Sequence, residues 1–250
     1  MPITDLLAIT VALPHEAKAI LPKMAISSKT QFGIGQFFEG KLGPHSCLLV
    51  QTGMGPQNAQ KAAGFLIENY PVTHLLATGY CGALVPEIKN RDAILASELL
   101  SRTDSRQRIA CDMSWGDRVA AKLTGLNIPV HRGVMVESPE PILKHEDKVT
   151  LAHETGALAV DMESFSVLNT VQRKEKITSL CLRFVVDALD DNLTNTEAFI
   201  EDTGGVKPLR LLGEAIRRPK LLIELPGLER LASGARKNLE KSIESVVSLF

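Results

Sequence analysis

Acidic residues and glycine turns directly follow several apolar runs of this 250-residue sequence. The run that ends at Val160 is followed at once by two acids, and the run that ends at Val186 by a third. Because ligands of α/β sheets bind at the carboxyl ends of the strands, these side chains are candidates for one shared site. The candidates are Glu16, Thr52, Gly53, Gly79, Tyr80, Asp161, Met162, Glu163 and Asp187.

The types of these residues indicate the chemistry of the ligand. Carboxylates accept hydrogen bonds from sugar hydroxyls, and glycine turns let a ligand approach the backbone closely. The set therefore favours an uncharged, polyhydroxylated ligand, of which a sugar joined to a heterocycle is the simplest. The segment TGMGPQNA matches neither the dinucleotide fingerprint nor the triphosphate-binding loop, so neither kind of site is indicated.

Each acid also has a purely structural explanation. Glu16 and Glu163 could be ordinary acids in the first turn of a helix, where the helix dipole favours negative charge. Asp187 could be a helix N-cap with Arg183 as its solvated neighbour. These explanations do not supply a reason for all three acids to fall just after strands.

Apolar runs alternate with helical patterns along the chain, which predicts an α/β fold with strands buried on both faces. Strands are expected at about 6–13, 46–52, 73–78, 92–98, 130–136, 157–160 and 177–186, and helices at about 14–21, 56–69, 112–125, 139–154 and 163–173. Residues 190–205 are polar and predict a long loop. Beyond it, Pro219 and Pro226 should break a basic tail into short amphipathic helices.

Composition excludes several classes of function. The chain has 28 basic and 29 acidic residues, so a nucleic acid partner has no electrostatic support. The histidines show no metal-binding spacing and the four cysteines form no CxxC pair, so neither a metal site nor a disulfide is expected. The first residues lack the basic region of a signal peptide and no apolar run reaches membrane-spanning length, which predicts a cytoplasmic location.

Five segments between residues 6 and 191 together resemble the nucleoside phosphorylase and nucleosidase superfamily, which includes the methylthioadenosine/S-adenosylhomocysteine nucleosidases. In chain order they are ALPHEAK, QTGMGPQNA, LATGYCGAL, AVDMES and LRFVVDALDD. Within the superfamily, TGALAVDMES and the tail LLGEAIRRPKLLIELPGLERLASGARKNL are most similar to the hopanoid-associated phosphorylases, which are thought to remove adenine from adenosylhopane.

The resemblance implies a three-layer α/β/α sandwich with a central mixed, mostly parallel sheet. It implies a catalytic domain at residues 1–205, with residues 206–250 as a helical extension packed on it. Glu163 would bind the ribose hydroxyls, Met162 would pack against the sugar and Glu16 would orient an attacking water. Asp187 would protonate N7 of the purine, which turns a poor anionic leaving group into a neutral one. That acid must hold its proton near neutral pH, and burial could raise its pKa accordingly.

The sequence departs from the family pattern at several of these positions. Val186 stands where a serine commonly precedes the catalytic aspartate, so the hydrogen bond that orients Asp187 must be missing or replaced. Asp161 stands where the family usually has glutamate. The segment ESPEPIL around Pro141 has no aromatic residue where nucleosidases tend to carry a phenylalanine that stacks on adenine, so the residues that recognise the base stay open.

The nucleophile is the second open question. In the phosphorylases an arginine precedes the glycine turn that follows the third strand, and Ala77 stands at that position here. Tyr80 replaces their serine or threonine. Both differences favour water as the nucleophile. The likeness to the hopanoid subgroup favours phosphate. Phosphorolysis, with inorganic phosphate as co-substrate and no cofactor, is placed slightly ahead because backbone N–H groups at Gly53–Gly55 could cradle the anion.

The sequence thus predicts a homo-oligomeric enzyme that cleaves the N-glycosidic bond of a purine nucleoside, with adenine as base and a bulky 5′ group. Hydrolysis of the methylthioadenosine/S-adenosylhomocysteine type is the alternative reaction. A nucleoside-binding protein without catalysis is a second alternative, motivated by Val186 and Ala77. The basic tail could also associate weakly with a membrane surface, although a solvated helical face or an oligomer contact explains it more simply.

Overall fold

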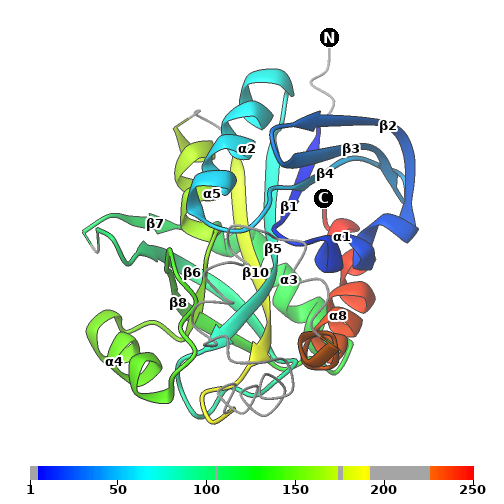
Figure 1. Ribbon diagram of the computed structural model, residues 1–250. Coiled ribbons are helices and arrows are strands. Elements are labelled where there is room, and N and C mark those ends of the chain that lie inside the picture. Colours follow the sequence, from blue (N-terminus) through cyan, green and yellow to red (C-terminus); the bar gives the residue numbers. More distant parts are fainter. Residues whose placement is uncertain (1–4, 105, 174–176, 192–225) are drawn as a thin grey trace.

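The computed structural model describes residues 5–104, 106–173, 177–191 and 226–250 of the chain (Figure 1). A short 3-10 helix at Leu21–Lys23 follows the first α-helix. The other elements, in chain order, are β1 (Leu7–Val11), α1 (Pro14–Ile20), β2 (Met24–Phe32), β3 (Gly35–Leu42), β4 (His45–Gln51), α2 (Pro56–Asn69), β5 (His74–Ala83), β6 (Ala93–Ser101), β7 (Arg108–Ala110), α3 (Met113–Gly125), β8 (Val130–Glu137), α4 (His145–Thr155), β9 (Ala159–Asp161), α5 (Ser164–Gln172), β10 (Thr178–Asp187) and α8 (Pro226–Val247).

The described strands form one mixed sheet that is partly closed on itself. β1 lies between β4 and β5, and β10 runs parallel to β5 on the other side. β10 also pairs with β6, β6 with β8, β8 with β9, and β9 returns to β5, so five strands form a ring. Parallel and antiparallel pairs are equally frequent among the described strands. The central mixed sheet expected from the sequence is therefore confirmed.

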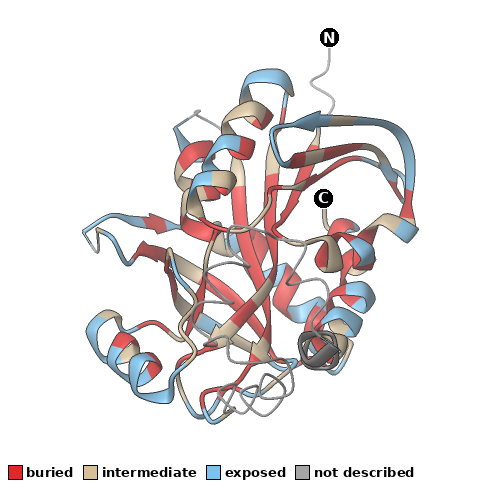
Figure 2. Cartoon of the chain, in the orientation of Figure 1, coloured by how far each residue is buried: buried red, intermediate tan, exposed pale blue. Residues whose placement is uncertain are grey.

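Helices cover the sheet on two sides, which confirms the three-layer arrangement. α2 packs on α5 on one side, and α1 and α3 pack on α8 on the other (Figure 1). Figure 2 shows the buried residues concentrated in the strands between these helices. All five residues of β1 are buried. Burial of each large aliphatic side chain stabilises the fold by about 1.5–3 kcal/mol.

The seven strands and five helices expected from the sequence are present, but three strands were missed. β2 exposes most of its residues and β7 has only three, so neither shows the continuous apolar run of a buried strand. β2 and β3 form an antiparallel hairpin at the edge of the sheet. Helix α4 begins at His145 rather than near 139. Glu140 precedes Pro141, and a residue before proline avoids the helical conformation.

The described part of the C-terminal segment, residues 226–250, contains a helix of 22 residues, α8. It begins at Pro226, because a proline at the first helical position loses no intrahelical hydrogen bond. Its buried side carries Ala235, Leu239, Ile243 and Val246, and the helix packs against α1, α3 and β10. This apolar side is therefore covered by the protein and is not available to a membrane surface. Pro219, the boundary at residues 205 and 206, and residues 192–205 of the expected loop lie outside the described residues.

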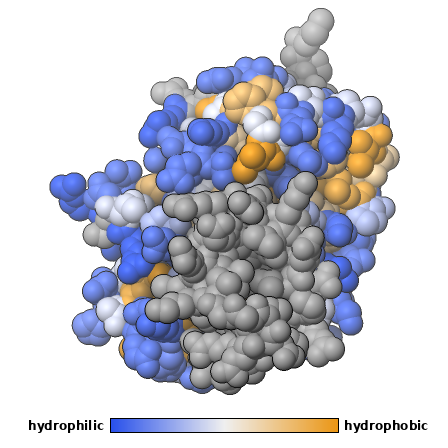
Figure 3. Space-filling model, in the orientation of Figure 1, coloured by the Kyte–Doolittle hydropathy of each residue, from blue (hydrophilic) through white to orange (hydrophobic). Residues whose placement is uncertain are grey.

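The described surface gives little sign of a membrane contact. On the face shown in Figure 3, hydrophilic side chains predominate and apolar ones gather in small groups. The large apolar side chains that are most exposed are Ile26, Phe32, Ile34 and Val149. None of the helices in the described ranges is long and apolar enough to cross a membrane.

Candidate active site

A cavity of about 220 Å³ lies where β5, β9 and β10 meet. Gly82 of β5 pairs with Val160 of β9 and with Asp187 of β10, so the residues that follow both strands are brought to the same place. Closure of the ring causes this convergence. Six of the nine residues predicted from the sequence line the cavity, namely Glu16, Tyr80, Asp161, Met162, Glu163 and Asp187.

The other three predicted residues support the site from behind. Thr52 is buried and its hydroxyl donates to the backbone oxygen of Gly53 at 2.8 Å. Gly53 has a φ of +83°, and a side chain there would meet Ile34, which covers it. Gly79, with a φ of +132°, lies beneath Glu16 and Arg183, and a Cβ atom would clash with both side chains. These residues shape the turns and do not line the cavity.

Backbone N–H groups fix the carboxylate of Glu16. Its Oε2 accepts from the N–H groups of Ala12 and Leu13 at 2.7 and 2.8 Å, and its Oε1 accepts from Tyr80 at 2.7 Å. Pro14 starts the helix and places Glu16 in the first turn, where the free N–H groups of the preceding residues point at it. Burial raises the pKa of Glu16, while Arg183 and the three N–H groups oppose the rise. The carboxylate is therefore held in one orientation.

Arg183 is the cation at the centre of the site, and the sequence-based expectation of a solvated Arg183 was wrong. Only 2% of the residue is exposed. Its Nη2 contacts Oδ2 of Asp161 at 2.8 Å, its Nε donates to Oγ of Ser164 at 2.9 Å, and its Nη1 donates to the backbone oxygen of Thr78 at 2.8 Å. A cation inside an otherwise apolar strand is buried because it neutralises the acids around it. Its place within the run LCLRFVV was the signal for that burial.

Asp161 lines the cavity, but its oxygens are engaged by the protein. Besides Arg183, Oδ1 accepts from the backbone N–H of Ser164 at 3.3 Å, and Oδ2 accepts from the Ser164 hydroxyl. These bonds hold the start of α5 in place. The N-terminus of α5 orients Glu163, whose Oε1 accepts from the Gly55 N–H at 2.7 Å. Burial and the charge of Asp161 raise the pKa of Glu163 to about 8, against the lowering effect of Arg183.

Asp187 is paired with Lys148, a residue that the sequence analysis missed. Lys148 is completely buried, and its Nζ contacts Oδ2 of Asp187 at 2.7 Å and the backbone oxygen of Ala188 at 3.0 Å. Oδ1 of Asp187 is buried and has no hydrogen-bond partner among the described residues, and the same holds for the Tyr80 hydroxyl. Burial raises the pKa of Asp187 and Lys148 lowers it, with a result of about 6. Lys148 thus replaces the contact that a serine at position 186 would make.

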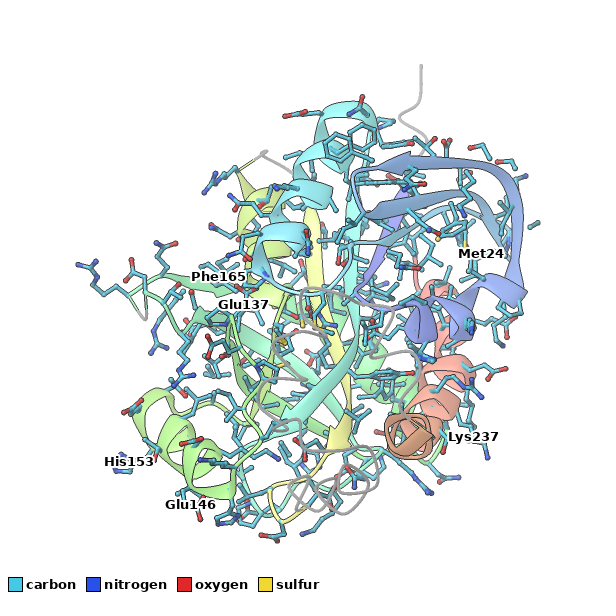
Figure 4. All side chains as sticks on the ribbon, viewed as in Figure 1. Met24, Glu137, Glu146, His153, Phe165 and Lys237 are labelled. Atoms are coloured by element: carbon cyan, nitrogen blue, oxygen red, sulfur yellow. The ribbon has the colours of Figure 1, made fainter. Side chains whose placement is uncertain are left out.

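The position of Lys148 on its helix was a usable signal. Lys148 and Leu151 are the buried residues of α4, one turn apart on the same side. Glu146 and His153 extend outward from the same helix (Figure 4). A lysine on the apolar side of an amphipathic helix needs a buried acceptor.

The rest of the cavity wall is mostly apolar, apart from the acid Glu140. Residues 140–143 lie between β8 and α4 and face Leu13, Met54 and Val186 across the cavity. Pro141 prevents a helix there. Ile142 and Leu143 line the cavity in the segment where nucleosidases tend to carry a phenylalanine. Among the described lining residues there is no lysine or arginine.

The turn at Gly53–Gly55 is not free to cradle a phosphate. The N–H of Gly53 donates to the backbone oxygen of Ala12 at 3.1 Å. The N–H of Gly55 donates to Glu163 at 2.7 Å. Two of the three N–H groups of this turn are therefore already used, and the expectation of an anion cradle there was wrong.

A further buried acid, Glu137, lies next to the cavity. Glu137, at the end of β8, accepts from the N–H and the hydroxyl of Ser166 at 2.7 and 2.8 Å. It lies close to Phe165 near the start of α5 (Figure 4). Burial raises the pKa of Glu137 to about 7. No motif in the sequence distinguishes Glu137, and it is not among the residues that line the cavity.

The fold thus gathers several acids around one partly apolar cavity in an α/β sandwich. A family model described as the phosphorylase superfamily matches residues 6–217. The chain belongs to this superfamily, which confirms the broader family resemblance found in the sequence. The narrower likeness to hopanoid-associated phosphorylases stays a prediction.

The similar proteins include both phosphorylases and nucleosidases. A DeoD-type purine nucleoside phosphorylase of Brevibacillus brevis is 28% identical over 144 residues, which cover 54% of this chain and 61% of the relative. A 5′-methylthioadenosine/S-adenosylhomocysteine nucleosidase of Mycobacterium bovis is 23% identical over 201 residues, covering 64% of this chain and 79% of the relative. The chain spans less than two thirds of the length of the first phosphorylases that it matches.

A solved structure confirms the fold. The 5′-methylthioadenosine/S-adenosylhomocysteine nucleosidase of Neisseria meningitidis, in complex with methylthio-immucillin-A, has a TM-score of 0.79 with this chain. The two share 18% sequence identity, and the match covers 98% of this chain and all of the other.

Proposed function

We propose that this protein cleaves the N-glycosidic bond of a purine nucleoside. One observation carries the proposal: Asp187, Glu163 and Glu16 line a single cavity, and the buried Oδ1 of Asp187 has no hydrogen-bond partner among the described residues. A buried acceptor or donor without a partner is costly, so a ligand group is expected to meet it. Membership of the phosphorylase superfamily supports the same reaction class.

The proposed roles follow from the chemistry of each group. Glu163 binds the ribose hydroxyls and Met162 packs against the sugar. Asp187 protonates N7 of the purine, and with a pKa of about 6 it keeps part of its proton near neutral pH. Glu16, held by three N–H groups, orients the attacking water. The bond then breaks with a neutral base as leaving group.

The described site favours water over phosphate as nucleophile. A phosphate would lie among five acids, Glu16, Glu140, Asp161, Glu163 and Asp187, without a lysine or arginine in the described lining. The backbone donors of the Gly53–Gly55 turn are largely used. Phosphorolysis, which the sequence placed slightly ahead, is the second candidate because the DeoD-type relatives are named phosphorylases. Mass spectrometry of the sugar product separates a free sugar from a sugar 1-phosphate.

The apolar wall supports a substrate with an apolar 5′ group. Ile142, Leu143, Leu13 and Met54 offer no hydrogen-bonding side chains to a polar substituent. Adenine is the proposed base. The most apolar substrate that we propose is a nucleoside with a lipid tail at the 5′ position, of the adenosylhopane type. Adenosine analogues with hydroxyl, methylthio and long alkyl groups at the 5′ position should be cleaved with rising kcat/KM in that order.

The proposal is tested by release of adenine from these nucleosides, with and without phosphate. Asp187→Asn should lower kcat by about 10²–10⁴-fold, which is the usual contribution of a general acid. Glu146→Gln, an exposed acid of α4, is the matched control and should leave kcat unchanged. Full activity of Asp187→Asn would overturn the assigned role. Tight binding of an adenosine analogue, with no turnover by either water or phosphate, would instead support a binding protein that lacks catalysis.

A cytoplasmic location and assembly into a homo-oligomer remain part of the proposal.

A further inference from the structure

We infer that Lys148 is a positioning residue of this site, because its bond to Oδ2 of Asp187 keeps the carboxyl proton on Oδ1, the oxygen that has no partner among the described residues. The inference rests on the proposed function, in which Asp187 is the proton donor. It assigns a role to a side chain that lies behind the cavity and does not contact the substrate.

The donor and acceptor inventory decides where the proton can be. The Lys148 ammonium has three hydrogens to donate and no lone pair to accept with. It donates to Oδ2 at 2.7 Å, so Oδ2 must act as an acceptor there. When Asp187 is protonated, its hydrogen therefore has to be on Oδ1. Without Lys148 the proton could equally be on Oδ2, facing the protein and out of reach of the base.

The protein holds this geometry from two sides. Nζ of Lys148 is also bound to the backbone oxygen of Ala188 at 3.0 Å, which fixes it relative to the end of β10. The pairing of β10 with β5 shifts its register between Val185 and Asp187, and Asp187 comes opposite Gly82. A Cβ atom at position 82 would lie 3.4 Å from Oδ2, so the carboxyl group lies directly over this strand.

Lys148 then serves both stages of the reaction. The proton moves from Oδ1 of Asp187 to N7 while the C1′–N9 bond breaks and its electron pair stays with the base. The water oxygen bonds to C1′, and the proton that the water loses passes to Glu16. Asp187 is left as a carboxylate next to the Lys148 ammonium, which stabilises the new charge in a site of low polarity. Exchange of the Glu16 proton with solvent and reprotonation of Asp187 complete the cycle.

The pH dependence has a defined sign. The titratable groups around Asp187 are Lys148 of α4, Cys81 of β5, Asp191 beyond β10, and Glu140, Asp161 and Glu163 of the cavity wall. Lys148 lowers the pKa of Asp187, whereas burial and Asp191 raise it. Removing Lys148 should therefore raise this pKa, and the alkaline limb of the pH–rate profile should move to higher pH.

The test compares two leaving groups in the full-length protein. An ordinary adenine nucleoside needs protonation at N7, whereas a 7-methylpurine nucleoside already carries a positive base and needs no proton. Lys148→Met should lower kcat on the first substrate by at least about tenfold, a part of the general-acid contribution. It should change kcat on the second by less than about threefold, and the alkaline limb of the pH–rate profile on the first substrate should shift to higher pH. Lys144→Met, an exposed lysine at the start of the same helix, is the control.

Lys148→Gln provides the conservative variant, because its amide can still donate to Oδ2. It should recover part of the activity on the ordinary nucleoside, and it carries the same comparison if Lys148→Met does not fold. Equal losses on both substrates, or no loss on either, would overturn the inference. A wild-type protein that releases the base from neither substrate would instead refute the proposed function itself.

Discussion

Replacing Arg183 with methionine should destabilise the protein, and by more at pH 8 than at pH 5.5. The side chain is buried and contacts Asp161, Ser164 and the backbone of Thr78. It also lowers the pKa of both Glu16 and Glu163. Methionine fills similar space without charge, so the change removes one cation from among three buried acids.

The size of the effect follows from the buried charges. Removing one partner of a buried ion pair costs about 3–5 kcal/mol, because the other partner stays buried and uncompensated. In a protein of this size that corresponds to a fall in Tm of roughly 6–20 °C at pH 8.

The pH dependence follows from the two glutamates. Glu16 and Glu163 have folded-state pKa values raised above 4.5, Glu163 to about 8. Their contribution to stability is present below their unfolded pKa and is lost as the pH rises through the folded value. Without Arg183 both pKa values rise further, so more stability is lost at pH 8. At pH 5.5 Glu163, with its pKa of about 8, is largely protonated and the cost is smaller.

Thermal and urea unfolding of both proteins at the two pH values measure the prediction. Arg132→Met is the matched control, because Arg132 forms an exposed pair with Asp117 and should change stability by less than about 1 kcal/mol. A loss below about 1 kcal/mol for Arg183→Met at pH 8, or an equal loss at both pH values, would refute the reasoning that Arg183 neutralises the buried acids.

Three further predictions concern single residues. Gly79→Ala should abolish base release and cost about 1–3 kcal/mol, because φ is +132° and the new Cβ clashes with Glu16; normal activity and Tm would contradict this. Because the pKa of Glu137 is raised to about 7, the free energy of unfolding of the wild-type protein should fall by about 3 kcal/mol between pH 4.5 and 7, and in Glu137→Gln this fall should be absent. Urea unfolding at pH 5 and 8 measures the pH dependence of both proteins. An equal pH dependence in the two proteins would show that Glu137 is not buried as a neutral acid. Glu163→Gln should lower kcat/KM by roughly tenfold, as expected for the loss of a hydrogen bond between a largely neutral carboxyl group and a ribose hydroxyl; an undiminished kcat/KM would argue against that bond.

The strands that carry the site could be predicted because their residues are apolar on both faces. The run before Asp161 and the run before Asp187 each stand out from the surrounding sequence. The acids after them were found for the same reason. β2 could not be found this way, because an edge strand faces solvent and its residues Ser27, Ser28 and Lys29 carry no apolar signal.

Partners that are distant in sequence were out of reach of local patterns. Glu163 was predicted from its place after a strand, but its bond to Gly55 depends on how α5 meets the turn before α2. Lys148 and Asp187 are joined through packing of α4 on the end of β10, which no motif encodes. Asp161 was predicted to bind substrate, yet Arg183 and the start of α5 occupy its oxygens. Residue type indicated the acids, and tertiary packing decided what each of them contacts.

The closed ring of strands has a consequence for how the protein reaches its active form. Pairing of β5 with β9 joins Gly82 to Val160, roughly 80 positions further along the chain. Contacts of such long sequence separation form slowly, since the intervening chain must lose its freedom before they are gained. A nascent or refolding chain should therefore acquire most of its helical content well before it can bind a nucleoside, and ligand affinity would report the final step of folding.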